Sequence, residues 1–367
     1  MPYEPVSRER KAAGLMQIVT GEAAGPVLAI ESSCDETAVA VLAADGSVLA
    51  ENVLSQLADH AKFGGVVPEI AARAHLAALP GLVTETLRQA GLRVADLRAI
   101  AATTGPGLIG GLIVGSSFGK GMAIAAGKLF VGINHLEAHA LTARLPGLVA
   151  GGAEFPYLAL LISGGHCQCV AVEGVGRYRK LGGTIDDSVG EAFDKVGKLL
   201  GVGWPGGPAI EAIAREGDPA AVALPRPMKG RAGCDFSWSG LKTAVAQMVA
   251  KLPAGALPRA TVADLAASFQ QAVVEVMADR VDHALAMMPN ARLLVVGGGV
   301  AANRGIRASL ETVAVQHGAR FAAPPARLCT DNAVMVGWTA LERLAAGVYD
   351  GLEVPPRPRW PLEELGG

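Results

Sequence analysis

The chain has 367 residues, of which 51% are hydrophobic and 18% are charged, and its mean hydropathy is +0.35. This composition excludes a largely disordered chain, and the length allows two domains with a sizeable core. The net charge of −2 excludes a general basic surface for nucleic acid, so any such contact must be local. Five cysteines without a CxxC pair, and a start that lacks the basic-then-apolar order of a signal peptide, predict a cytoplasmic protein.

The first half is predicted to begin with strands that are joined by polar turns. Residues 1–26 predict a poorly ordered extension, in which Met16 is an alternative start. Alternating and buried-type apolar runs then predict three strands: Val27–Ile30, Ala38–Leu42 and Val48–Val53, with the polar turn Glu31–Thr37 after the first and the hairpin turn Asp45-Gly46 before the third.

The uncharged stretch from Ala99 to Gly119 is long enough to raise the question of a membrane span. Because it contains Pro106 and six glycines, a strand at Ala99–Thr104, a loop, and a helix from about Gly111 to Ala126 explain it better. The loop Gly105–Gly110 matches GxGxxG, but residues 125–136 contain no acidic side chain, which argues against a dinucleotide site. A generic phosphate contact at the start of the helix remains open.

His135 and His139 are four residues apart on a predicted helix, with Asn134 as its N-cap. Residues at this spacing lie one turn apart on one face, about 6 Å between Cβ atoms, and can hold one divalent metal. A chance pair is an equally good interpretation of the spacing alone. Glu137 lies roughly 200° round the helix from each histidine, which argues against a zinc peptidase with a glutamate base.

The second half repeats the pattern of the first after a Gly- and Pro-rich boundary near 145–156. A strand at Tyr157–Ile162, a turn at Ser163–His166 and a strand at Cys167–Val172 follow each other, with Cys167 and Cys169 on one face, where burial is the better interpretation. Two similar units predict a duplicated α/β fold with a ligand cleft between its halves.

Further helices and glycine loops follow along the chain. Ser188 and Glu191 form a capping-box pattern for a helix that ends at Leu200. The strand Arg292–Val296 runs into Gly297–Gly299, and a helix follows from about Asn303. Glycine loops after three buried-type strands predict a phosphate-bearing ligand between the two halves.

The chain resembles the TsaD family of tRNA adenosine threonylcarbamoyltransferases from about Val27 to about Ala346. The resemblance rests on these motifs: IESSCDET at 30–37, GGVVPEIAARAH at 64–75, TTGPGLIGGL at 103–112, NHLEAH at 134–139, ISGGH at 162–166, DDSVGEAFDKVGKLLG at 186–201, PGGPAIE at 205–211, DFSWSGLKTAV at 235–245, GGGVAAN at 297–303 and CTDNAVM at 329–335. It implies the duplicated actin-like, sugar-kinase-like (ASKHA) fold, with lobes at 27–150 and 151–310 and a segment 311–367 that returns toward the first lobe.

The resemblance also implies an activity. The threonylcarbamoyl group would pass from threonylcarbamoyl-adenylate to the exocyclic amine of the adenosine next to the anticodon, in tRNAs that read codons beginning with A, and AMP would leave. The implied metal ligands are His135, His139 and Asp331, which suit iron (Fe²⁺) or zinc. The implied substrate contacts are Leu161, Ile162, Ser163, Gly164, Gly165, Asp194, Gly207 and Asn303. The implied partners are tRNA and bacterial TsaB- and TsaE-type proteins, with no membrane.

Several of these residues have simpler interpretations. His166 is a candidate catalytic base, or a strand-end histidine bonded to backbone. Asp331 would by default cap the helix Asn332–Leu344, Asn303 would cap its own helix, and Asp194 would be a solvated helix residue. The basic side chains Lys229, Arg231 and Lys242 suit tRNA phosphates or an ordinary solvated surface.

Two rival functions belong to the same fold. A non-catalytic paralogue such as TsaB lacks the two metal histidines, which this chain has. A sugar or acetate kinase would need a catalytic acid and MgATP.

Overall fold

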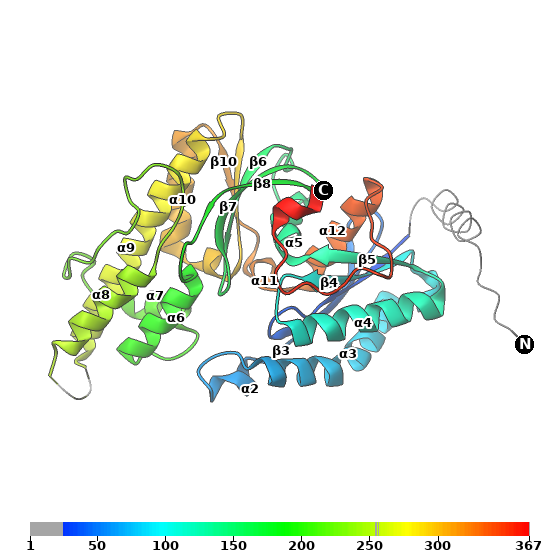
Figure 1. Ribbon diagram of the computed structural model, residues 1–367, viewed down its shortest axis with the longest axis horizontal. Helices are drawn as coiled ribbons and strands as arrows, with labels where there is room; N and C mark the ends of the chain where they lie inside the picture. Colours follow the sequence, from blue (N-terminus) through cyan, green and yellow to red (C-terminus); the bar gives the residue numbers. More distant parts are fainter. Residues whose placement is uncertain (1–24, 254, 256, 367) are drawn as a thin grey trace, which may run out of the picture.

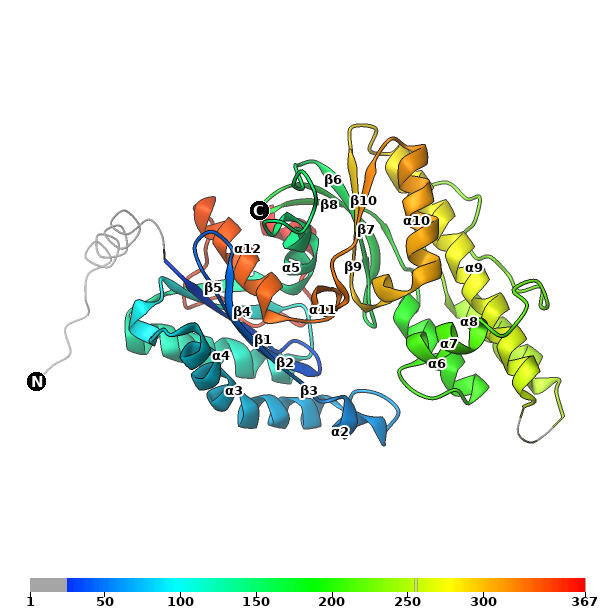
Figure 2. The ribbon, with the colours of Figure 1, turned by 180° about the vertical axis from the view of Figure 1, so that it is seen from behind.

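The computed structural model describes residues 25–366 except 254 and 256, so Met16 and nearly all of the predicted N-terminal extension lie outside the described residues. Two five-stranded sheets form the two halves of the molecule (Figures 1 and 2). The strands of the first sheet are β1 (Val27–Glu31), β2 (Glu36–Leu42), β3 (Val48–Ser55), β4 (Ala99–Gly105) and β5 (Leu129–Asn134). The strands of the second are β6 (Tyr157–Ile162), β7 (Cys167–Gly174), β8 (Arg177–Gly183), β9 (Leu293–Gly297) and β10 (Arg320–Ala322).

The two sheets have the same topology. Their orders are β3-β2-β1-β4-β5 and β8-β7-β6-β9-β10. In each, the first three strands form an antiparallel meander, and the next two strands run parallel to the first. The duplication predicted from the strand–turn–strand repeat is therefore confirmed.

Helices cover both sheets. Those between β3 and β6 are α2 (Leu57–Ala61), α3 (Pro68–Ala90), η1 (Val94–Asp96), α4 (Ile109–Ala126), α5 (His135–Leu141) and η2 (Thr142–Arg144). Those after β8 are α6 (Val189–Leu200), α7 (Gly206–Ala214), α8 (Ser239–Ala250), α9 (Arg259–Ala286), η3 (Gly299–Ala302), α10 (Arg304–Gln316), α11 (Ala326–Cys329), α12 (Ala333–Ala345) and η4 (Leu362–Gly366).

The first sheet is buried on both faces. On β1, Leu28 and Ile30 pack with α3 and α4, whereas Val27 and Ala29 pack with α12, as the period of two in a strand requires. Helix α12 (Ala333–Ala345) is far along the chain from β1 (Val27–Glu31), so the C-terminal part of the chain completes the core of the first sheet. The predicted division at 27–150, 151–310 and 311–367 stays a prediction.

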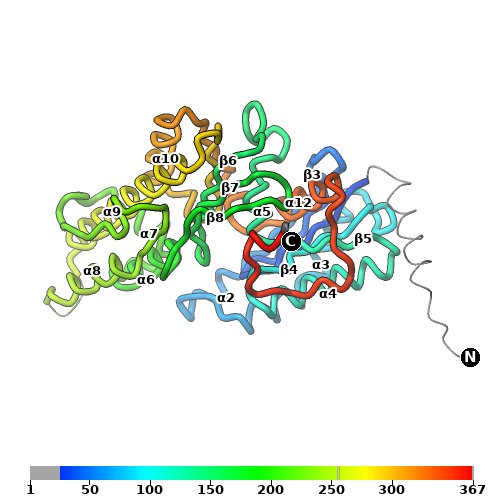
Figure 3. Tube along the Cα trace, turned by 45° about the horizontal axis from the view of Figure 1, so that its top comes forward, coloured from blue at the N-terminus to red at the C-terminus, as the bar shows by residue number. Residues whose placement is uncertain are grey.

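Helix α5 lies between the two sheets in both views (Figures 1 and 2). It follows β5 directly, contacts α12, and packs Leu136 and Leu141 against the second sheet beside Tyr157. The segment before η4 crosses the first half along α4 and ends near α5 (Figure 3). The Arg357 amide donates to the Thr104 carbonyl at 2.7 Å.

Among the described residues, α4 is the one helix that is long and apolar enough to cross a membrane by length and composition. It packs along β4 and α3, with Leu112 and Ala123 buried. The predicted strand, loop and helix in this stretch are confirmed, and α4 is accounted for as a layer helix of the first half.

Glycines of the loop after β4 and of the first turn of α4 allow close packing. A Cβ at Gly107 would lie 2.6 Å from the Ser33 carbonyl oxygen, and a Cβ at Gly111 would lie 2.1 Å from that of Ser32. The amides of Gly107 and Leu108 donate to the carbonyls of Pro358 (3.2 Å) and Ser33 (2.7 Å). These two amides are therefore bonded within the protein, whereas the phosphate contact expected at the start of α4 itself stays a prediction.

Gly111→Ala should therefore lower the free energy of unfolding by about 1–3 kcal/mol, because the new methyl group must displace the Ser32 backbone. Gly121→Ala in the same helix is the matched control, since a Cβ there meets nothing within 4 Å. That variant should gain up to about 1 kcal/mol from helix propensity. Urea unfolding of both variants checks this, and equal effects would contradict the packing role.

Candidate active site

The two predicted metal histidines lie on α5 at the end of β5. The Asn134 side chain accepts from the amides of Leu136 (2.9 Å) and Glu137 (3.3 Å), which confirms it as the N-cap. Both histidines are buried, and their ring centroids lie 4.7 Å apart.

Asp331 faces both rings. The N-cap of α12 is its neighbour Asn332, whose side chain accepts from the Met335 amide at 2.9 Å. The expected default role of Asp331 as a cap is therefore wrong, and its carboxylate is free to point elsewhere. Asp331 Oδ1 lies 3.4 Å from His135 Nε2 and 3.2 Å from His139 Nε2.

This donor set fits one divalent metal. One ligand atom from each of His135, His139 and Asp331 lies within 4.8 Å of the others. Bonds of about 2.0–2.2 Å in tetrahedral or octahedral geometry place ligand atoms roughly 3.0–3.5 Å apart, the range of both contacts to Asp331. His139 Nδ1 is buried without a hydrogen-bond partner among the described residues, which leaves Nε2 as the nitrogen engaged with the carboxylate. Two imidazoles and one carboxylate suit iron and zinc alike.

Glu31 lies behind His135 and was not predicted as part of the site. Its Oε2 lies 3.3 Å from His135 Nδ1, and Ser33 Oγ lies 3.1 Å from the same nitrogen. The fully buried Glu31 carboxylate also accepts from the Ser33 amide at 2.6 Å and from the Thr103 hydroxyl. A carboxylate in this place orients a ligand histidine. The available signal was an acid that directly follows the apolar strand Val27–Ile30.

Negative charge is concentrated at the site. Burial would raise the pKa of Asp331, but His135 and His139 hold it well below its ordinary value. Burial would lower the pKa of His135, but the Asp331 and Glu31 carboxylates raise it well above its ordinary value. Burial, followed by the charges of Asp331 and Asp35, raises the pKa of Glu36 to about 9. Glu36 is therefore protonated at pH 7, because burial and the neighbouring carboxylates disfavour its charged form, and a site of this kind favours a cation.

Glu137 belongs to a different cluster. Its carboxylate forms an ion pair with Arg343 at 2.9 Å and accepts from the Tyr178 hydroxyl at 2.9 Å and the Gly176 amide at 3.3 Å. These partners are not in the metal triad, as the helix angle predicted. A peptidase base at Glu137 is therefore excluded.

A cavity of about 730 Å³ opens beside the triad. It lies at the carboxyl ends of strands from both sheets, where open α/β sheets bind ligands. Its lining from the first half is Ser33–Glu36, Gly64–Val66, Pro106–Leu108 and His135; its lining from the second is Ser163–His166, Glu191, Asp194, Lys195, Lys198, Trp204, Gly299, Thr330 and Asp331.

A second cavity, of about 280 Å³, adjoins the first in the second half. The two share Gly164, Asp194, Gly299 and Thr330 in their linings. The remaining residues of the second cavity are Gly190, Phe193, Pro205, Gly207, Pro208, Glu211, Val300, Ala302 and Asn303. A ligand with two ends can thus occupy both spaces.

The loop after β6 is a tight turn. The Ser163 hydroxyl accepts from the amides of Gly165 (3.3 Å) and His166 (3.2 Å), and the Ser163 amide donates to the His166 carbonyl at 2.8 Å. Leu161 and Ile162 lie in β6 just before it, and both are buried. Gly298, with a φ of 95°, allows η3 to approach, since a Cβ there would lie 2.3 Å from the Ile162 carbonyl oxygen.

Asp194 and Asn303 combine a structural bond with a place at the second cavity. Asp194 on α6 accepts from the Gly206 amide at 2.6 Å, at the start of α7, so the interpretation as a solvated helix residue is wrong. Asn303 caps α10 by accepting from the Ile306 amide at 3.0 Å, as its simpler interpretation held, and it also donates to Gln270 at 2.9 Å. Gly207 lines the same cavity.

His166 lies at the cavity edge, its ring centroid 6.3 Å from that of His135. Burial, and then the charges of His135 and His139, lower the pKa of His166 to about 4. The ring is therefore neutral at pH 7 and can accept a hydrogen bond, although it is a weak base.

Two of the basic side chains considered for tRNA are already paired. Lys229 contacts Glu275 and Lys242 contacts Asp187, each at 2.9 Å.

Ser188 caps α6 by accepting from the Glu191 amide at 3.2 Å, but Glu191 itself pairs with Lys195 at 2.8 Å. Only half of the predicted capping box is thus seen among the described contacts.

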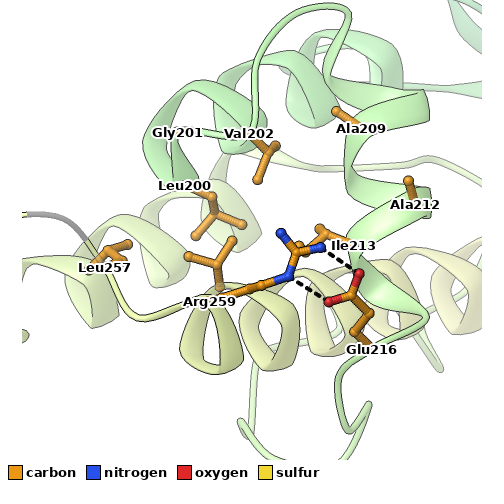
Figure 4. A pocket seen from close by; sticks show the side chains of 10 residues that line it. Leu200, Gly201, Val202, Ala209, Ala212, Ile213, Glu216, Leu257 and Arg259 are labelled. Atoms are coloured by element: carbon orange, nitrogen blue, oxygen red, sulfur yellow. Dashed lines mark hydrogen bonds and ion pairs between the residues drawn. The ribbon is translucent and has the colours of Figure 1, made fainter.

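A further cavity, of about 480 Å³, lies among α6, α7 and the start of α9 (Figure 4). Apolar side chains such as Leu200 and Ile213 line it, and the Arg259–Glu216 ion pair at 2.7 Å crosses it. None of the predicted site residues is among the described residues that line this cavity.

Comparisons with known proteins agree with the resemblance. A family model described as TsaD, tRNA N6-adenosine threonylcarbamoyltransferase, matches residues 47–338. The protein of that name from Granulibacter bethesdensis is 66% identical over 347 residues, which cover 92% of this chain and 94% of the relative. The one from Gluconobacter oxydans is 64% identical over 344 residues, which cover 92% of this chain and 94% of that relative.

Solved structures are similar in fold. The crystal structure of T. kodakarensis HypF matches with a TM-score of 0.57 and 14% identity, over 89% of this chain and 48% of that chain. Full-length HypF in a phosphate- and nucleotide-bound form matches with a TM-score of 0.57 and 11% identity, over 88% of this chain and 46% of that chain. At such identity the likeness concerns the fold alone. The predicted duplicated actin-like, sugar-kinase-like fold is confirmed.

Glu137→Gln should lower the free energy of unfolding by about 3–5 kcal/mol, because it leaves the Arg343 charge buried with a weaker set of partners. Metal affinity should change by less than about twofold, since none of the Glu137 partners belongs to the triad. Urea unfolding and a metal titration check the two parts. A large loss of metal affinity with intact stability would contradict the assignment.

Proposed function

The chain belongs to the tRNA N6-adenosine threonylcarbamoyltransferase family, and from that premise we propose how its cleft carries out the transfer. The family's activity places a threonylcarbamoyl group on the N6 amine of an adenosine in tRNA. We propose threonylcarbamoyl-adenylate as the donor. We propose as acceptor the adenosine next to the anticodon, in tRNAs that read codons beginning with A.

The donor is proposed to lie across the two adjoining cavities. Its AMP part occupies the cavity lined by Gly207 and Asn303, and its threonylcarbamoyl part reaches the larger cavity near His135. Asp194 and the turn Ser163–Gly165, with Leu161 and Ile162 behind it, contact the phosphate and the carbamoyl group at the junction. The support is that the shared lining of the two cavities includes Gly164 and Asp194.

The reaction needs one bond to form and one to break. The N6 amine attacks the carbamoyl carbon, the bond from that carbon to the phosphate oxygen breaks, and AMP leaves with the electron pair. The Gly164 amide can stabilise the charge that develops on oxygen, because it has no acceptor among the described contacts, whereas the amides of Ser163, Gly165 and His166 are bonded within the turn. His166 is the proposed acceptor of the amine proton, and its lowered pKa keeps it neutral for that role. AMP is a good leaving group from a mixed anhydride, so a weak base is sufficient.

His135, His139 and Asp331 are the proposed ligands of one divalent metal, iron (Fe²⁺) or zinc. Such an ion supplies Lewis-acid polarisation of a substrate oxygen. Glu31 would hold the His135 ring with Nε2 toward the ion, because its carboxylate lies beside Nδ1. The single observation that carries the proposal is the position of this triad at the edge of a cavity shared by both halves.

The proposed partners are tRNA and TsaB- and TsaE-type bacterial proteins, and the proposed location is the cytoplasm. The relatives named above come from bacteria. A tRNA substrate agrees with a cytoplasmic location and with the near-neutral net charge, provided that the tRNA contact is local or shared with a partner.

His139→Ala should lower transfer by roughly 100-fold or more, the scale on which removal of an electrostatic stabiliser lowers kcat. The assay supplies unmodified tRNA, threonylcarbamoyl-adenylate and the two partner proteins, and measures threonylcarbamoyladenosine and AMP. His317→Ala is the matched control, because His317 pairs with Asp282 at 2.8 Å beside α10, away from the triad. Its activity should equal that of the wild type.

Full activity in a metal-stripped His135→Ala/His139→Ala protein would contradict the metal proposal. A wild-type protein that transfers nothing, yet phosphorylates a small molecule with ATP, would replace the proposed function by that of a kinase.

A further inference from the structure

A network of buried polar side chains lies under the first half of the large cavity and has no part in the transfer as described. Its members are Thr37 on β2, Gln56 after β3, His60 on α2 and His75 on α3. Three of them are fully buried, and Gln56 is 2% exposed. Buried polar groups of this kind must be hydrogen-bonded, and here the partners are specific.

The His75 ring has a defined protonation. Its Nε2 lies 3.1 Å from the Cys34 carbonyl oxygen, which can only accept, so Nε2 carries the proton. Its Nδ1 then accepts from the Thr37 hydroxyl at 2.7 Å and from the Gln56 amide group at 3.3 Å. Burial lowers the pKa of His75, which agrees with this neutral form.

The other end of the network holds a second segment. His60 Nδ1 accepts from the Val67 amide at 3.3 Å, and its Nε2 donates to the Gln56 side-chain oxygen at 3.3 Å. The Gln56 backbone amide also donates to the Asp35 carbonyl at 3.1 Å. One connected set of bonds therefore fixes the backbone at Cys34–Asp35 and at Val67.

Both fixed segments form the cavity wall. Cys34, Asp35 and Glu36 line the large cavity, and so do Gly64–Val66, which directly precede Val67. The proposed contacts to the adenylate all lie in the second half of the chain. The wall held by the network is thus the part of the cavity left for the acceptor.

We propose that His75, together with Gln56, is a positioning residue for the tRNA acceptor. It holds the Cys34–Glu36 and Gly64–Val66 segments so that together they receive the acceptor adenosine. This inference rests on the proposed function. It gives a role to GGVVPEIAARAH at 64–75, which begins in one wall segment and ends at the histidine that supports the other.

The test distinguishes an effect on the binding of tRNA from an effect on the binding of threonylcarbamoyl-adenylate. His75→Asn keeps an acceptor near the position of Nδ1 but is too short to donate to the Cys34 carbonyl, whereas His75→Gln reaches that carbonyl. Leu79→Ala is the matched control, because Leu79 is fully buried one turn along α3 and packs in the core. The KM values for unmodified tRNA and for threonylcarbamoyl-adenylate are measured in the complete system, with the melting temperature of each variant.

His75→Asn should raise the KM for tRNA about tenfold, the effect of one lost buried hydrogen bond, and leave the KM for the adenylate within about twofold of wild type. His75→Gln should have a KM for tRNA close to that of the wild type. Leu79→Ala should lower the melting temperature without separating the two KM values.

Two results would overturn the inference while the proposed function stands. One is an unchanged tRNA KM in folded His75→Asn. The other is a parallel rise of both KM values that Leu79→Ala reproduces. A wild-type protein that forms no threonylcarbamoyladenosine would overturn the proposed function, and this inference with it.

Discussion

The position of the Asp331 carboxylate between the two histidines of α5 is the contact on which the site depends. Oδ1 of Asp331 lies 3.2 Å from His139 Nε2 and 3.4 Å from His135 Nε2. It joins the start of α12, which completes the core of the first sheet, to a helix that packs on the second sheet. Burial of a carboxylate is unfavourable unless it is paired, so this contact ties the geometry of the site to the packing of both halves.

The rest of the site follows from the shared topology of the two sheets. The central strand of each sheet ends at the cleft, with Glu31 as the last residue of β1 and Ser163 directly after β6. Close approach of the loops there requires small residues: Gly111 makes room for Ser32 in the first half, and Gly298 makes room for the end of β6 in the second. Glycine in these loops thus serves backbone packing as well as ligand access.

Local signals in the sequence predicted much of this arrangement. The strand Tyr157–Ile162 has its predicted bounds, and the caps at Asn134 and Ser188 are confirmed. Local signals could not decide features that depend on the folded backbone. The adjacent residues Asp331 and Asn332 are both of a type that caps helices, and only the backbone conformation shows that Asn332 is the cap. The 28-residue helix α9 buries consecutive residues, so it lacks the periodicity that would reveal it. The carboxylate of Glu31 could be placed behind His135 only once β1 and α5 were adjacent.

One metal is proposed to lie between α5 and the start of α12, at the edge of the ligand cavity. Anomalous diffraction from crystals grown with Fe²⁺ or Zn²⁺ and AMP tests it most directly. We expect one anomalous peak, within about 2.0–2.2 Å of His135 Nε2, His139 Nε2 and an oxygen of Asp331, with AMP in the adjoining cavity. A peak at other residues, or none from either ion in a protein that still forms threonylcarbamoyladenosine, would contradict it.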